Sequence, residues 1–172
     1  MFTFRTPSLD DVDWITEACQ DPEILRWTLV PRPYTTDHAR SFVADHAGEV
    51  IAWAIFEDGD SRGIGMLGVH HVVEGVASIG YWIAPWARRR GAASAAIAFA
   101  CRELASWDDV HSISATIAAT NSASRRTAER AGLSAINSPS AGDCPDGDKI
   151  VEGVTYLLNL DRSHKRDVPH CR

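Results

Sequence analysis

The stretch IGYWIAPWARRRGAAS, at positions 79–94, decides the fold of this chain. An apolar, strand-like run ends at Pro85, and an alanine-rich segment of helical periodicity follows Gly91. Three arginines, at positions 88–90, stand at the start of that helix, where the positive end of the helix dipole disfavours cations. The first amides of a helix have no internal partners and bind anions well. The segment therefore predicts a cradle for a pyrophosphate group.

The backbone of the same segment indicates how such an anion would be held. Gly91 has no side chain, so a bulky group can approach the main chain, and Ala93 keeps the next inward position small. Arginine side chains add charge-assisted hydrogen bonds. A solvated basic cap on an ordinary helix is the alternative interpretation. The predicted anion-binding residues are Arg88, Arg89, Arg90, Gly91, Ala92, Ala93 and Ser94.

Hydrophobic periodicity and short connections predict an α/β (α+β) fold around one mixed sheet. Turn formers at 58–60 and 74–75 join neighbouring strands closely, which makes those strands antiparallel. The strand at 110–118 is reached through a helix at 91–105, so it should pair parallel to the strand at 77–83. We therefore expect a mostly antiparallel sheet of about six to seven strands, one parallel pair and flanking helices. The other expected strands are 2–5, 50–56, 63–69, 133–137 and 151–160, and the other expected helices are 8–19, 21–27, 36–46 and 121–131.

No linker divides the chain, so we expect a single domain over residues 1–160. Turn formers fill 138–148 almost completely, which predicts a mobile loop. The segment 161–172 is polar and has no apolar face, which predicts a disordered tail.

Composition narrows the function classes. At 172 residues and 45% hydrophobic, the chain is long enough to bury a substantial core. A formal net charge of -6 argues against general nucleic-acid binding, which needs a basic surface. No apolar run approaches the roughly 20 residues that span a bilayer, and the N-terminal residues lack the pattern of a signal peptide. We therefore expect a cytoplasmic protein with no membrane or nucleic-acid partner.

The cysteines and histidines show no metal-binding pattern. Cys19, Cys101, Cys144 and Cys171 are scattered without C-x-x-C spacing, and we expect reduced thiols. No histidine has an i, i+4 partner of the kind that zinc helices use. We expect no metal site.

Two further segments complete a family pattern. The strand before the arginines and the helix at 121–131 lie in the order and spacing of the GNAT superfamily of acetyl-CoA-dependent N-acetyltransferases. The chain resembles, within it, the branch of the ribosomal-protein alanine N-acetyltransferases, over most of its length. The motifs that carry the resemblance fall on Arg88, Gly91 and Ala93; on Ile79, Gly80, Tyr81, Trp82, Ile83 and Pro85; and on Asn121, Ser124, Ala131, Gly132 and Leu133, where the last position is usually Phe.

The resemblance implies a site between the parallel strands. The pantetheine arm of acetyl-CoA would enter the gap between them and pair with the main chain at Ile83, and Asn121 would lie across the gap. An amine attacks the thioester, and Ser124 would give a hydrogen bond to the departing sulfur. Since serine is common in the first turn of a helix, Ser124 as a simple capping residue is the alternative.

The base that takes the amine proton is less clearly marked. Many relatives carry Glu two residues before the strand glycine, and this chain has Ser78 there. His71 and Glu74, near the turn at 74–75, are the candidates, and each is equally an ordinary polar turn residue.

The acceptor site follows from the resemblance alone. The resemblance implies that Trp27, Tyr34 and the 138–148 loop bind the substrate. Both aromatic residues are also candidates for the core or its rim.

We interpret the chain as an enzyme that transfers acetyl from acetyl-CoA to a primary amine, either a protein N-terminal amine or a small-molecule amine. A sensor that binds acyl-CoA without turnover is the alternative that the missing glutamate leaves open. A nucleic-acid module using the arginines is the third. The protein should be a monomer or a homodimer.

Overall fold

The computed structural model describes residues 1–136 and 143–161. Three short 3₁₀ turns lie at Leu9–Asp11, His46–Gly48 and Pro85–Ala87. The helices are α1 (Val12–Ala18), α2 (Pro22–Trp27), α3 (Thr36–Asp45), α4 (Ala92–Leu104) and α5 (Ser122–Arg130). The strands are β1 (Phe2–Arg5), β2 (Ile51–Glu57), β3 (Gly63–Val73), β4 (Val76–Ile83), β5 (Ser112–Ala118), β6 (Ser134–Ile136), β7 (Asp143–Asp146) and β8 (Lys149–Asn159).

One sheet organises these elements. Its strand order is β1-β2-β3-β4-β5-β8-β6, and β7 pairs with β8 off this path. Of the strand pairs described, β4 with β5 is parallel and the others are antiparallel. This confirms the predicted mixed sheet with flanking helices. The described residues form eight strands rather than six to seven, because one strand lies in a segment predicted to be a loop.

That strand corrects part of the prediction for 138–148. β7 and the start of β8 form a hairpin in which Asp146 pairs with Lys149. The two-residue turn between them is Gly147–Asp148, with Gly147 at a φ of 67°, so the Gly-Asp dipeptide acts here as a hairpin signal. Pro145 is tolerated because β7 is an edge strand. The rest of the predicted loop, at 138–142, and the predicted tail beyond 161 lie outside the described residues.

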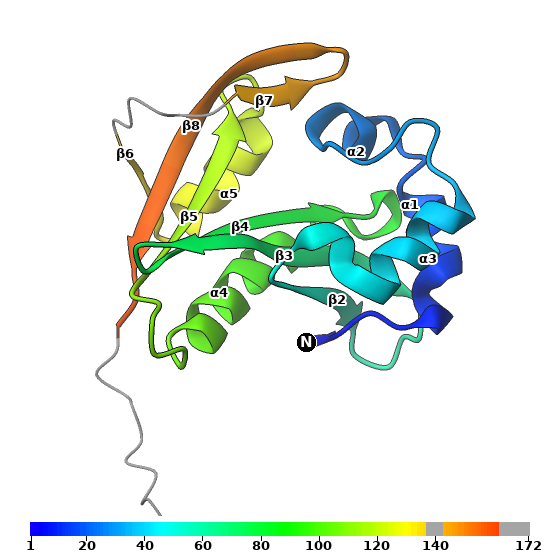
Figure 1. Cartoon of the computed structure of the whole chain (residues 1–172), viewed down its shortest axis with the longest axis horizontal. Coiled ribbons are helices and arrows are strands. Elements are labelled where there is room, and N and C mark those ends of the chain that lie inside the picture. The colour runs from blue at the N-terminus through cyan, green and yellow to red at the C-terminus, as the bar shows by residue number, and fades with distance from the viewer. Residues whose placement is uncertain (137–142, 162–172) are drawn as a thin grey trace, which may run out of the picture.

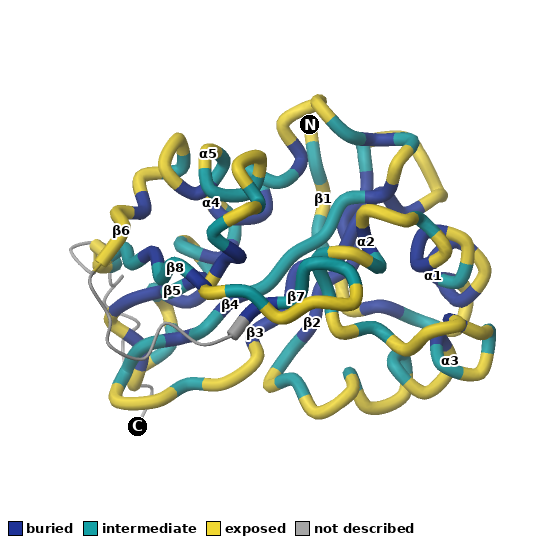
Figure 2. The backbone as a smooth tube through the Cα atoms, turned by 90° about the horizontal axis from the view of Figure 1, so that it is seen from above, coloured by how far each residue is buried: buried dark blue, intermediate teal, exposed yellow. Residues whose placement is uncertain are grey.

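The sheet separates two hydrophobic cores. Side chains alternate along each strand, so Trp53 and Ile55 of β2 enter the core shared with α4 and α5, while Ala54 and Phe56 enter the core shared with α1 to α3. Buried residues follow the strands, and the outward turns of α1 and α3 are exposed (Figure 2). None of the described helices has the length and apolarity needed to cross a bilayer.

β4 and β5 remain paired for only part of their length. Three pairs join them, from Val76 with Ser112 to Ser78 with Ser114. Beyond these, β4 continues along β3, and β5 continues along β8 as far as Ala118. Figure 1 shows β5 and β8 leaving the line of β4 at a wide angle, with α4 below β4, α5 beside β5 and α2 near the open end. The edges of β4 and β5 that face each other are therefore free of strand partners in this part of the sheet.

A buried carboxylate ties the first strand to the first helix. Asp11 is 1% exposed and accepts two hydrogen bonds from Arg5, at 2.7 and 2.9 Å. It also accepts from Nε1 of Trp14 at 2.8 Å and from the amide of Ser8 at 2.7 Å. Burial by itself raises the pKa of Asp11, but these hydrogen bonds outweigh it and hold the pKa below its ordinary value.

Replacing Asp11 with Asn should lower the free energy of unfolding by about 2 kcal/mol, since one amide cannot accept all four hydrogen bonds. The pKa of Asp11 is lowered in the folded state, so its contribution is present above the unfolded pKa and is lost as the pH falls below about 4. Urea unfolding at several pH values measures this difference. Asp37→Asn, which removes an exposed ion pair with Arg40, is the control and should change stability by less than about 0.5 kcal/mol. Equal effects of the two variants would contradict the prediction.

Candidate functional site

A hydrogen bond crosses the gap between the diverging strands. Tyr81 of β4 lies on the α4 and α5 side of the sheet, and its hydroxyl is 3.0 Å from Oγ of Ser124 in α5. The amide of Ser124 donates to Oδ1 of Asn121, which caps α5, at 3.1 Å. The predicted positions Asn121 and Ser124 are thus held together, and Ser124 contacts β4.

Tyr81 is a site residue that the sequence interpretation did not single out. Burial raises the pKa of its hydroxyl, and the hydrogen bond with Ser124 offsets this only in part. The tyrosine therefore stays protonated and can donate to Ser124. Its alternation with Ile79 and Ile83 along β4 is the signal that places it on the face toward α5.

The start of α4 is open as predicted. Gly91 is the N-cap with a φ of 86°, a left-handed value that favours glycine, and α4 begins without a side-chain cap. A Cβ built on Gly91 would meet no atom within 4 Å. The first α-helical hydrogen bond at this end runs from the amide of Ala95 to the carbonyl of Gly91, at 3.0 Å. The amides of Ala92, Ala93 and Ser94 precede it, so they can bind an anion.

The three arginines beside this helix have different partners. Arg88 forms an ion pair with Asp21, and its Nε donates to the carbonyl of Ile83 at 3.2 Å. Arg90 pairs with Glu57 at 2.9 Å. Among the described residues Arg89 has no hydrogen-bond or ion-pair partner. Of the three predicted anion-binding arginines, Arg89 is therefore the one whose charge is not paired within the described residues. At Ile83, the predicted contact for the pantetheine arm, the carbonyl already accepts a hydrogen bond from Arg88.

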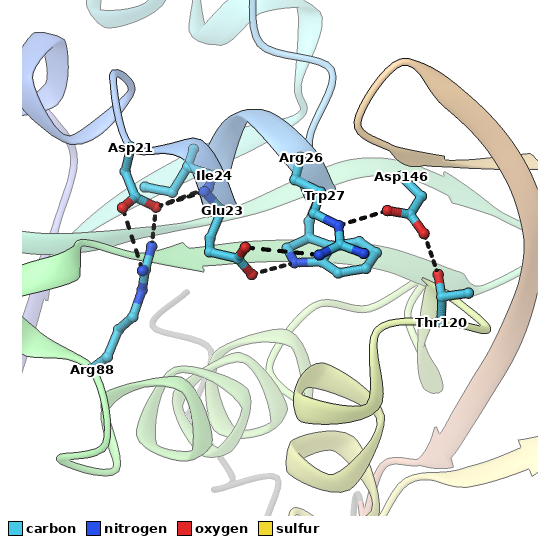
Figure 3. A network of polar contacts seen from close by, with 8 residues as sticks. All are labelled: Asp21, Glu23, Ile24, Arg26, Trp27, Arg88, Thr120 and Asp146. Atoms are coloured by element: carbon cyan, nitrogen blue, oxygen red, sulfur yellow. Dashed lines mark hydrogen bonds and ion pairs between the residues drawn. The ribbon is translucent and has the colours of Figure 1, made fainter.

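Helix α2 connects the two halves of the divided sheet, as Figure 3 shows. At its N-terminus Asp21 accepts from the amides of Glu23 and Ile24 and holds Arg88, which follows β4. At its C-terminal end Nε of Arg26 donates to Asp146 of β7 at 2.6 Å. The same carboxylate accepts from Thr120, just after β5, at 2.8 Å.

Asp21 and Asp146, at the two ends of this network, are held ionised. Hydrogen bonds from Arg26 and then Thr120 lower the pKa of Asp146. Burial raises the pKa of Asp21, but the hydrogen bonds from Arg88 and from the α2 amides outweigh it and lower the pKa overall. Both ion pairs are therefore intact at neutral pH.

The predicted bases lie elsewhere. Glu74 sits in the β3–β4 turn with a φ of 49°, at the closed end of the strands. A strand rises about 3.3 Å per residue, so Glu74 is roughly 20 Å along the chain path from Tyr81. His71 is opposite Ser78, roughly 10 Å along β4 from Tyr81. The structure does not bring either side chain to the Tyr81–Ser124 pair, and their catalytic roles remain unsupported predictions.

The two predicted substrate aromatics differ in burial. Tyr34 is 7% exposed and belongs to the core with α1 to α3, which favours the alternative of a core aromatic, and its place in an acceptor site stays a prediction. It packs there beside Cys19, whose burial raises the pKa of that thiol to about 12. Trp27 is partly exposed at the end of α2, and its Nε1 donates to Glu23 at 3.0 Å. Trp27 thus remains near the opening, in the network of Figure 3.

Comparison with known families gives a direct match. The family model described as the acetyltransferase (GNAT) domain matches residues 2–134, which include β1 to β5, α4 and α5. No protein of curated function matches the chain.

Solved structures of three acetyltransferases have the same fold. The ribosomal L7/L12 alpha-N-protein acetyltransferase RimL, in complex with coenzyme A, is 17% identical with a TM-score of 0.79 over 94% of this chain and 95% of that one. The microcin C7 self-immunity acetyltransferase MccE, in complex with acetyl-CoA and AMP, is 14% identical with a TM-score of 0.79 over 92% of each chain. Spermidine N-acetyltransferase from Vibrio cholerae, in complex with CoA and spermine, is 16% identical with a TM-score of 0.76 over 92% of this chain and 95% of that one. At these identities the likeness shows the fold alone.

The network at α2 predicts a local effect of removing Arg26. In Arg26→Ala, backbone hydrogen exchange should rise in α2 and in the β7–β8 hairpin, while the midpoint of global unfolding stays within error of the wild type, because the lost contacts join surface elements. Hydrogen exchange followed by mass spectrometry measures this. Arg40→Ala, which removes an exposed pair on α3, is the matched control. Unchanged exchange at both elements would show that the network does not hold them together.

Proposed function

The chain belongs to the acetyltransferase (GNAT) family, and we propose that it transfers an acetyl group from acetyl-CoA to a primary amine. The acceptor would be a protein N-terminal amine or a small-molecule amine. One observation carries the proposal: the open N-terminus of α4 stands beside the gap between β4 and β5, which Tyr81 and Ser124 face.

The residues at the gap fit acetyl-CoA. The amides of Ala92, Ala93 and Ser94 suit a pyrophosphate, and the free space above Gly91 admits one. Arg89 supplies an uncommitted positive charge beside them. When bound, acetyl-CoA supplies a thioester carbonyl that a neutral amine attacks.

Tyr81 and Ser124 form a chain of hydrogen bonds toward the gap. Because the tyrosine stays protonated, it can donate to Oγ of Ser124 and leave the serine proton free to point at a departing sulfur. Serine is a very weak acid, so its role is to stabilise the developing thiolate rather than to transfer a proton. Asn121 holds the amide of Ser124 and so positions the hydroxyl.

The surroundings of the gap support an amine acceptor. Three carboxylates, of Asp21, Glu23 and Asp146, lie along α2 and β7 with two guanidinium groups, of Arg88 and Arg26, so a negative charge is left over for a cationic group to meet. The named substrates of two structurally similar proteins, a ribosomal-protein N-terminus and a polyamine, are both amines. Trp27 offers an apolar surface at the same opening.

A sensor that binds acyl-CoA without turnover is the second candidate. The observation that favours it is Ser78, which leaves β4 without a carboxylate of its own. The two candidate functions are distinguished by measuring the release of free thiol from acetyl-CoA. The acceptors are short peptides with N-terminal Ala or Ser, and spermine. An acetyltransferase releases thiol with one of them, and a sensor releases none.

Gly91→Trp should abolish acetyl-CoA binding that the wild type shows near one per chain, because the indole fills the space above the first turn of α4. Isothermal titration calorimetry measures the binding. Gly132→Trp is the matched control, since Gly132 is also left-handed, at a φ of 92°, with open space around its Cβ. The control should bind as the wild type does. Absence of binding to the wild-type protein would refute the proposed function.

Ser124→Ala should lower kcat by about 10²-fold and Tyr81→Phe by about tenfold, and the double variant should lose less than the product of the two, because both act on the same sulfur. Steady-state thiol release gives these values. Thr127→Ala, which removes a hydroxyl one turn further along α5, should retain full kcat. If Ser124→Ala turned over at the wild-type rate, Ser124 would be only a capping residue.

A further inference from the structure

Two paired glycines leave an open patch on the sheet beside the gap. Gly68 of β3 pairs with Gly80 of β4, on the face covered by α1 to α3. A Cβ at Gly68 would collide with the carboxylate of Glu49, and a Cβ at Gly80 would collide with Nε2 of His70. The two side chains therefore occupy the space that the glycines leave free.

The side chains over this patch form a carboxylate–imidazole pair. Nδ1 of His70 lies 3.5 Å from Oε1 of Glu49. The Glu49 side chain is 22% exposed and that of His70 is 48% exposed, so the carboxylate is covered and the imidazole is open to solvent. A carboxylate this close favours the tautomer with the proton on Nδ1, and in that tautomer the neutral imidazole has its lone pair at Nε2, above Gly80.

The segment that delivers Glu49 is held in an unfavourable conformation. His46, Ala47 and Gly48 have successive φ values of 56°, 54° and 82°, and two of them are not glycine. Oε2 of Glu49 is buried and has no hydrogen-bond partner among the described residues, and the same is true of Nε2 of His46. Strained backbone and unpaired buried polar atoms gather at functional sites, because folding alone disfavours them.

No other charged contact to this pair occurs among the described residues. His46, at the end of α3, packs edge-on against Phe42. Asp45 is exposed and accepts a hydrogen bond from the amide of Ala47. Ser78 shares the face of Gly80 and does not titrate.

The pair lies next to the reaction region. Gly80 directly precedes Tyr81 in β4, and the free edge of β4 begins at Ile79, where pairing with β5 has stopped. Neighbouring residues of a strand point to opposite faces, so His70 covers one face of β4 while Tyr81 and Ser124 hold the other. Nε2 of His70 therefore lies on the α1 to α3 face of β4, one residue from Tyr81.

We propose that His70 accepts the proton of the acceptor amine and that Glu49 positions its imidazole, which supplies the base that Ser78 does not. This inference rests on the proposed acetyl transfer. The amine proton passes to Nε2 as the nitrogen–carbon bond to the acetyl group forms. The carbon–sulfur bond breaks, the sulfur leaves as a thiolate that takes a proton from water, and the imidazolium returns its proton to water. The sum is amine plus thioester to amide plus thiol.

The first test compares His70→Gln and Glu49→Gln with the wild type, using the peptide or polyamine that turns over best. His70→Gln should lower kcat by about 10²-fold, remove the acid limb of the kcat–pH profile, which protonation of the imidazole causes, and leave the acetyl-CoA affinity unchanged by calorimetry. Added imidazole should restore part of the rate. Glu49→Gln should lower kcat by about tenfold. Glu152→Gln, an exposed carboxylate on β8, is the control and should keep wild-type kcat.

A second variant displaces the Glu49 carboxylate from His70 without replacing either residue. Gly68→Ala introduces a methyl group where the Glu49 carboxylate lies, and the flexible end of that side chain can move away. The fold should be retained, and kcat should fall as it does in Glu49→Gln. The unfolding midpoint of each variant is measured as well, for His70→Gln, Glu49→Gln, Glu152→Gln and Gly68→Ala.

Chemical labelling gives a readout that does not depend on turnover. Diethyl pyrocarbonate modifies neutral, exposed imidazoles, and the acceptor should slow the labelling of His70 relative to that of its exposed neighbour His71, as read by tandem mass spectrometry. Equal labelling with and without acceptor would contradict the placement of the amine.

The outcomes separate this inference from the proposed function. If the wild type acetylates an amine and His70→Gln keeps its kcat and pH profile, the role of His70 is wrong and the acetyl transfer stands. If acetyl-CoA binds and no amine in the panel is acetylated, both the acetyl transfer and the role of His70 are wrong. The protein is then better described as a sensor that binds acyl-CoA without turnover.

Discussion

The parallel pairing of β4 with β5 lasts for three residue pairs, and the rest of the site depends on where it stops. Each strand has a full antiparallel partner on its other side, so neither loses its place in the sheet when the two diverge. The divergence frees two strand edges within an otherwise continuous sheet. A free edge of this kind can accept an extended ligand as if it were another strand. The helix between the two strands begins at the same open end, so an anion site and a strand-like site adjoin.

Helix α2 links the β4 side of the sheet to the β5 and β8 side, which diverge from each other. Its N-cap, Asp21, holds the arginine that follows β4, and its Arg26 holds the hairpin on the β8 side. Arg88 also donates a hydrogen bond to the carbonyl of Ile83, so one guanidinium links the N-terminus of α2 to the end of β4.

The two faces of β4 carry different polar groups. Tyr81 and Ser124 present hydroxyls, suited to stabilising negative charge on sulfur, while Glu49 and His70 present a carboxylate and an imidazole, suited to receiving a proton. The strand between them keeps these groups from bonding to one another. All four residues lie within the stretch that the family model matches, and Glu49 and His70 lie on the face of β4 that carries Ser78.

Local patterns in the sequence by themselves determined the strand–turn–helix unit at 79–94, the left-handed Gly91 and the cap of Asn121 on Ser124, because each depends on neighbours within a few residues. The mixed sheet followed from connection lengths. Only the tertiary structure decided that Tyr81 meets Ser124, that Arg26 meets Asp146 and that Glu49 lies over Gly68, since these partners are 43, 120 and 19 residues apart and periodicity carries no information on such pairs. It also placed Tyr34 in the core, since the burial of this side chain depends on the packing of α1 and α3 around it. Side-chain pairing across a fold follows from how elements pack, and packing depends on all of them at once.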